Sequence, residues 1–162
     1  MHLKKIRLIK RFCKDKEFNI SLAESCTGGL LSSLFTQIPG SSEFFDSSYI
    51  VYSNKSKVNA LKVPLRIIKK YGAVSKNTSL QMAKLLYKNT KTDIVLSITG
   101  VAGPDGGTKN TPVGTVFFTL GSRNKQKISY KTFHKKFRNT GRKNIQKKSV
   151  MFAIDQILKI LS

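Results

Sequence analysis

The sequence predicts a single three-layer α/β/α domain with a mixed β-sheet, spanning residues 1–162. Strand-like and helix-like segments alternate over most of the chain, which is the pattern of a layered α/β fold. Two consecutive strand-like segments near the C-terminal end are joined by a short polar stretch, as in an antiparallel hairpin, and this makes the sheet mixed. The 162 residues, 40% of them hydrophobic, suffice for one core, and no change in composition marks a second domain.

The first half of the chain begins with an amphipathic helix. Residues 1–16 place Leu3, Ile6, Ile9 and Phe12 at helical spacing and run straight into a strand. Glycine, proline and capping residues delimit the later segments. The elements expected next are a strand at 18–23, a helix from about Gly28, a loop at 39–42, a strand at 48–52, a short helix capped by Asn54, a helix from Pro64 to Gly72, and a helix at 78–90.

The second half predicts the centre of the sheet and the hairpin. Residues 93–99 have an unbroken apolar centre, which indicates a strand buried on both faces. A glycine-rich loop at 100–108 follows this strand. The remaining elements are strands at 114–120 and 126–134, paired around a turn at 121–124, and a helix at 141–161. Ligands of such folds gather at the carboxyl ends of strands, so we expect the functional site there.

Composition indicates the compartment. No stretch approaches the roughly 18–20 consecutive apolar residues that a membrane span requires, so we expect a soluble protein with no membrane partner. Cys13 and Cys26 suggest neither a disulfide framework nor metal-ligand spacing. We therefore expect a cytoplasmic location.

The net charge of +22 has two explanations. Thirty Lys and Arg against eight Asp and Glu would attract the phosphates of nucleic acids or of nucleotides. Alternatively, the excess of lysine is a general compositional bias with no role in function. The sequence leaves both open.

The segment Ser25–Gly29 places a hydroxyl where a strand gives way to a helix. Ser25 would project from the end of the sheet, and unpaired amides in the first helical turn would donate to an oxyanion or a phosphate. Gly28 and Gly29 would let a ligand approach the backbone. Ordinary capping of a helix is the alternative interpretation.

A base for this hydroxyl is harder to find. His2 and His134 are the two histidines and neither is well placed, so we expect no Ser-His-acid triad and no histidine metal site. Cys26 is better explained as a buried thiol behind Ser25. Lys57 follows the second strand closely and would serve if its pKa fell from about 10.4 toward 7. A solvated surface lysine is the alternative.

Five blocks of sequence, covering about residues 20–120, resemble the CinA C-terminal domain family in its stand-alone form. These proteins are the nicotinamide-nucleotide amidohydrolases, or NMN deamidases. The blocks are 23–29, 39–42, 52–54 with Lys57, 72–75, and 99–108 with 112–116.

The resemblance implies that the carboxamide of nicotinamide mononucleotide (NMN) is hydrolysed to nicotinate mononucleotide and ammonia, as part of pyridine nucleotide recycling in a bacterial cytoplasm. It implies a Ser/Lys mechanism with no metal and no cofactor, in which Ser25 is the nucleophile, Lys57 its base and Tyr52 an assisting residue. With the amides of the two glycine-rich turns, the expected substrate-binding positions are Cys26, Thr27, Gly28, Gly29, Thr99, Gly100, Gly103, Gly106 and Arg142.

The chain departs from the family near its last helix. Gly141 stands where an aspartate usually precedes Arg142, and Gln146 stands where a second arginine is expected, so substrate affinity is in doubt. Two alternatives therefore remain, a nucleotide-binding protein with weak turnover and a nucleic-acid-binding module that uses the basic segment 123–148. The family also implies a homo-oligomer, to which an exposed Phe44–Phe45 pair would contribute.

Overall fold

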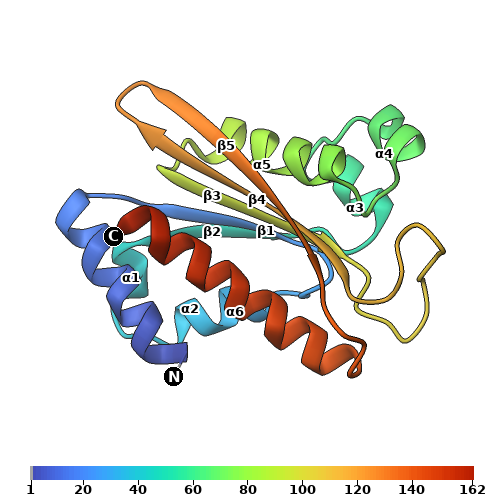
Figure 1. Cartoon of the computed structure of the whole chain (residues 1–162). Helices are drawn as coiled ribbons and strands as arrows, with labels where there is room; N and C mark the ends of the chain where they lie inside the picture. The colour runs from blue at the N-terminus through green and yellow to red at the C-terminus, as the bar shows by residue number, and fades with distance from the viewer. Residues whose placement is uncertain (1) are drawn as a thin grey trace.

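A five-stranded sheet lies between two layers of helices in the computed structural model, which describes residues 2–162 (Figure 1). The strand order is β2-β1-β3-β4-β5. The first three strands in this order are parallel, and β4 and β5 run antiparallel to their neighbours. The predicted α/β fold with a mixed sheet is therefore confirmed. The strands are β1 (Ile20–Glu24), β2 (Phe45–Ile50), β3 (Ile94–Gly100), β4 (Thr115–Asn124) and β5 (Lys127–Lys136).

Each face of the sheet has its own core. One face is covered by α1 (His2–Lys16), α2 (Leu30–Thr36) and α6 (Arg142–Leu161), and the other by α3 (Asn54–Asn59), α4 (Leu65–Tyr71) and α5 (Lys76–Thr90). A 3-10 turn at Ser41–Glu43 leads into β2. Along β3 successive apolar side chains alternate between the two cores and are buried on both sides, as predicted.

The hairpin differs from the prediction in the position of its turn. Both strands are longer than expected, and the chain reverses at Lys125, whose φ is 55°. Gly121 lies inside β4, where a Cβ atom would come within 2.7 Å of the Val95 side chain and 2.8 Å of the Tyr130 ring. This glycine therefore serves close packing within the sheet, and it does not mark a turn.

Two other local expectations need correction. Phe44 is fully buried, and Phe45 is half-buried with its ring 5.5 Å from that of Phe35, so these rings belong to the core and offer no exposed pair. The short helix α3 is capped by Ser53, one residue before the expected Asn54. None of the helices within residues 2–162 is both long enough and apolar enough to span a bilayer.

Candidate active site

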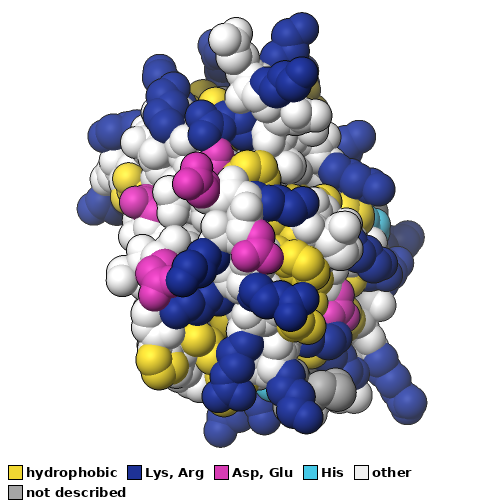
Figure 2. Space-filling model, turned by 90° about the vertical axis from the view of Figure 1, so that its left-hand side faces the viewer, with side chains coloured by type: hydrophobic (Ala, Val, Ile, Leu, Met, Phe, Trp, Pro, Cys, Tyr) yellow, Lys and Arg dark blue, Asp and Glu magenta, His cyan; other side chains and the backbone are white. Residues whose placement is uncertain are grey.

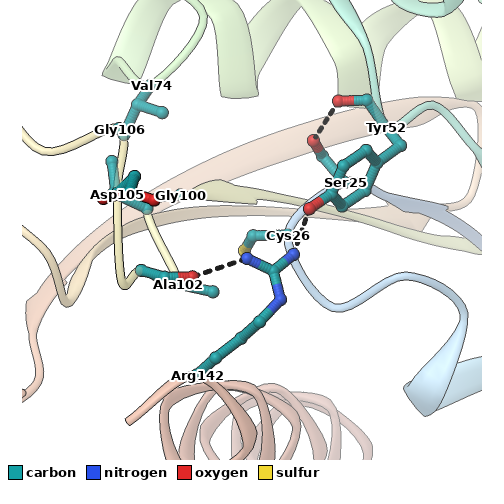
Figure 3. A pocket seen from close by; sticks show the side chains of 11 residues that line it. Ser25, Cys26, Tyr52, Val74, Gly100, Ala102, Asp105, Gly106 and Arg142 are labelled. Atoms are coloured by element: carbon teal, nitrogen blue, oxygen red, sulfur yellow. Dashed lines mark hydrogen bonds between the residues drawn. The ribbon is translucent and has the colours of Figure 1, made fainter.

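Ser25 is held at the carboxyl end of β1. Its amide donates to the carbonyl of Ile98 on the neighbouring β3 at 2.9 Å, so the position of the residue is fixed by the sheet. The carbonyl of Ser25 accepts from the amide of Gly28 at 3.0 Å, which closes a tight turn. The side chain is 5% exposed and lines a cavity (Figure 3).

The carboxylate of Glu24 occupies the N-terminal end of α2. It is fully buried and accepts from the amides of Gly29, Leu31 and Ser32 at 3.1, 3.2 and 2.8 Å. The helix begins at Leu30, later than expected. The amides of its first turn are therefore already paired with a carboxylate and are not free to bind a ligand.

Two amides of the turn remain free. Within residues 2–162, neither the amide of Cys26 nor that of Thr27 has a hydrogen-bond partner. The hydroxyl of Thr27 is also buried without one. Because buried polar groups are rarely left unpaired, these groups are available for an anion or a water molecule.

Lys57 reaches Ser25 because α3 is capped at its start. The Ser53 hydroxyl accepts from the Ser56 amide and the Ser56 hydroxyl accepts from the Ser53 amide, each at 3.0 Å, a reciprocal capping box that starts the helix directly after Tyr52. Lys57 then points inward and is 2% exposed. Its Nζ lies 2.8 Å from Ser25 Oγ and 3.0 Å from the carbonyl oxygen of Val51.

Burial lowers the pKa of Lys57 from 10.5 to about 8, and the nearby Cys26 opposes this in part. The geometry suits the neutral amine. A neutral amine has two N–H groups and one lone pair, so it can donate to the carbonyls of Val51 and Tyr52, the latter 3.4 Å away, and accept the Ser25 hydroxyl proton. Burial raises the pKa of Cys26 to about 12, so this neighbour is an uncharged thiol.

The cavity beside Ser25 has a volume of about 220 Å³. Arg142, from the first turn of α6, spans it: one nitrogen donates to the carbonyl of Gly103 at 2.6 Å, and another donates to the Tyr52 hydroxyl (Figure 3). Both acceptors are neutral. An anionic ligand would therefore bind the guanidinium more strongly than its present partners do.

Of the twelve site residues that the sequence suggested, seven line the cavity and five do not. Thr99 is 1% exposed and its hydroxyl donates to the carbonyl of Ala73, so it faces the α5 side and not the cavity. Lys57 lies behind Ser25, and Thr27, Gly28 and Gly29 also lie off the cavity wall. The suggested residues that line it are Ser25, Cys26, Tyr52, Gly100, Gly103, Gly106 and Arg142.

Tyr52 meets the Ser25–Lys57 pair through its backbone. Its carbonyl lies 3.5 Å from Ser25 Oγ, whereas its hydroxyl is turned toward Arg142 (Figure 3). The side chain is 54% exposed and forms the mouth of the cavity. Tyr52 thus connects the residue pair to the guanidinium.

Sequence reasoning missed four residues of the cavity wall. Val74 comes from the connection between α4 and α5, and the others belong to the loop after β3. Asp105 was within a block already quoted, and its carboxyl group was the available signal. The four residues are Val74, Val101, Ala102 and Asp105.

The acidic residues lie mostly at the other end of the molecule. Those at positions 15, 17, 43, 46 and 93 precede the strands of the parallel part or lie at their amino ends. Figure 2 shows this end, where acidic side chains are interspersed among Lys and Arg. At the carboxyl ends, among the described residues, Glu24 is buried and Asp105 is exposed. The charged side chains on the cavity wall are therefore one cation, Arg142, and one acid, Asp105.

Known proteins are similar to this chain over almost its whole length. The family model of the CinA C-terminal domain matches residues 3–161. A CinA-like protein of Fusobacterium nucleatum is 41% identical over 148 residues, 91% of this chain and 35% of that protein. A CinA-like protein of Thermotoga neapolitana is 38% identical over 154 residues, 95% of this chain and 36% of that protein. The chain thus spans about a third of the length of these curated relatives.

Solved structures extend the similarity to the whole fold. The competence/damage inducible protein CihA from Agrobacterium tumefaciens superposes with a TM-score of 0.92 at 30% identity, covering 99% of this chain and 96% of that one. A competence or damage-inducible protein from Enterobacter asburiae gives a TM-score of 0.92 at 29% identity, covering 100% and 99%.

Proposed function

The chain belongs to the family of CinA C-terminal domains, and on this basis we propose that it is an amidohydrolase that converts nicotinamide mononucleotide and water to nicotinate mononucleotide and ammonia. One observation carries the proposal. A serine at the end of a strand lies 2.8 Å from a lysine that is 2% exposed and whose pKa is lowered to about 8. The distance allows direct proton transfer, and a pKa of about 8 leaves part of the amine neutral near that pH, as nucleophilic attack by a hydroxyl requires.

The first half-reaction forms an ester with the protein. Ser25 Oγ attacks the amide carbon while its proton passes to the neutral amine of Lys57. The carbonyl oxygen of the substrate becomes an oxyanion, which accepts from the free amide of Cys26, the residue after Ser25 on the cavity wall. Lys57 then returns the proton to the departing nitrogen, and ammonia leaves as the C–N bond breaks.

The second half-reaction releases the acid. Lys57, neutral again, takes a proton from a water molecule that attacks the ester carbon. The same amide stabilises the second tetrahedral intermediate, and the proton returns to Ser25 Oγ as the C–O bond breaks. The products are nicotinate mononucleotide and the original enzyme.

Arg142 is the proposed contact for the phosphate or the ribose. The absence of an acid at Gly141 does not leave its side chain loose, because Gly103 and Tyr52 supply two acceptors that orient the guanidinium. These acceptors are neutral, so the full positive charge is available to an anionic group. These two acceptors would take the orienting role of the missing aspartate.

The decisive experiment measures ammonia released from NMN by the purified protein and its variants. Ser25→Ala and Lys57→Ala should abolish turnover. Lys55→Ala is the matched control, since Lys55 is an exposed lysine in the same short helix. Thermal unfolding of each variant establishes that it is folded.

Robust turnover by Ser25→Ala would falsify the proposal. An inactive parent that binds NMN would instead support the nucleotide-binding alternative with weak turnover. An inactive parent that binds DNA with a steep salt dependence would favour the nucleic-acid module based on segment 123–148. Sedimentation at several concentrations tests the expected homo-oligomer.

A further inference from the structure

Gln146 lies on the same face of α6 as Arg142, one helical turn further along. Its Nε2 donates to the carbonyl of Cys26 at 2.8 Å, although the two residues are 120 positions apart in the chain. The family resemblance suggested a phosphate contact at this position. The structure instead directs the side chain to the turn that carries Ser25.

This bond fixes one peptide group of the turn. On one side the turn is held by the Ser25 amide on Ile98, and on the other by the Gly28 amide on the Ser25 carbonyl. Between them, the carbonyl of Cys26 accepts from no other donor within residues 2–162. Gln146 is therefore the residue that determines the orientation of the peptide between Cys26 and Thr27.

The orientation of this peptide determines where its amide points. In a trans peptide the C=O and the N–H point in opposite directions. With the Cys26 carbonyl directed at α6, the Thr27 amide is directed away from α6, and it is one of the two free amides of the turn. A rotation of this peptide would therefore change the conformation of the turn that presents Ser25 and the Cys26 amide to the cavity.

The support behind Gln146 is rigid. Ile145 is fully buried in the core, and Ser149 donates to its carbonyl at 2.8 Å. A side chain on a packed helix positions a neighbouring group more closely than one on a loop.

We infer that Gln146 is a positioning residue for catalysis. By holding the Cys26 carbonyl it fixes the turn that presents Ser25 and the Cys26 amide to the cavity. The inference rests on the proposed amidohydrolase function and adds to it a residue that does not itself touch the substrate.

The test uses three variants. Gln146→Met keeps the length of the side chain and removes the N–H donors, whereas Gln146→Arg keeps a donor. Asn144→Ala is the matched control, because the side-chain Nδ2 of Asn144 donates from the same helix to the carbonyl of Thr140, outside the cavity. Thermal unfolding accompanies each variant.

With NMN as substrate, Gln146→Met should lower kcat by about 10- to 100-fold, the scale of a misaligned catalytic group, with KM within about twofold. Gln146→Arg should retain most of the parent kcat, and Asn144→Ala all of it. The pH midpoint of activity should not move in Gln146→Met, because the contacts of Lys57 are untouched. An unchanged kcat in Gln146→Met would overturn the inference.

A second measurement is independent of activity. In ¹⁵N-labelled protein the amide nitrogen of Thr27 reports on the hydrogen bond at the Cys26 carbonyl of the same peptide. Its resonance should move in Gln146→Met and stay in Asn144→Ala. No movement overturns the inference even if the protein is inactive on NMN, whereas movement in an inactive parent supports the positioning and rejects the proposed reaction.

Discussion

The two walls of the cavity are built in different ways. The wall that carries Ser25 and Lys57 is buried, and the carbonyls of Ile98, Val51 and Tyr52 hold its polar groups at 2.9–3.5 Å. The opposite wall is the loop after β3, in which residues 104–110 are exposed, closed by the Arg142 side chain. The proposed bond-breaking chemistry thus belongs to the buried wall, and recognition of the substrate belongs to the accessible wall.

The largest expected effect is on the buried wall. Replacing Lys57 with Met removes the base while filling the same space, and turnover of NMN should fall by about 1,000-fold or more. Steady-state ammonia release measures this. If the variant retains a tenth of the parent activity, Lys57 is not the base and the buried wall does not carry the chemistry.

The same variant should reveal the thermodynamic cost of the buried amine. The folded-state pKa of Lys57 is about 8 and its ordinary value is 10.5, so between these values the unfolded chain binds more protons and stability rises with pH. Relative to Lys57→Met, the parent should gain about 2–3 kcal/mol between pH 7 and pH 10.

Chemical denaturation at both pH values tests this second prediction. The difference between the two proteins cancels the titration of the other lysines. A difference that does not change with pH would mean that Lys57 has the same pKa in the folded and unfolded states.

The pH dependence of turnover follows from the same pKa. Because the base must be neutral, activity should rise through a midpoint near pH 8 and fall about tenfold for each unit below pH 7. Rates at saturating NMN from pH 6 to pH 9 measure this. A flat profile over that range would assign the base to another group.

The smallest expected effect is on the accessible wall. Arg142→Ala removes the guanidinium that faces an anionic substrate, and KM should rise about tenfold, while kcat changes less. The matched control is Lys143→Ala, an exposed cation next along α6 that does not line the cavity. A fall in kcat with KM unchanged would mean that Arg142 acts in the chemical step, and the two walls would then not divide chemistry from substrate recognition.

Local patterns were enough for the framework. The helix between Pro64 and Gly72 begins and ends where these residues predict, since proline presets the first turn and glycine adopts the φ of 85° at the end. The apolar centre of β3 predicted burial on both faces. The strand-to-helix change at Ser25 likewise predicted which hydroxyl would lie at the carboxyl end of the sheet.

Local sequence patterns could not predict the contacts between distant segments. That Glu24 pairs with the first amides of α2 depends on the direction in which its side chain leaves β1. The hairpin turn moved from Gly121 to Lys125 because Val95 and Tyr130 need the space a glycine leaves. Asp105 and Val74 line the same cavity although no periodicity relates them.

The sequence by itself therefore determined the elements, the mixed sheet and the residue types at its carboxyl end, because dihedral preferences and alternation of apolar residues act over a few positions. Only the tertiary structure decided that the Lys57 ammonium would lose its water, that Arg142 would span the cavity and that Gln146 would hold the turn. Burial and hydrogen-bond geometry depend on which distant segments the packed core brings together, and no local pattern specifies that.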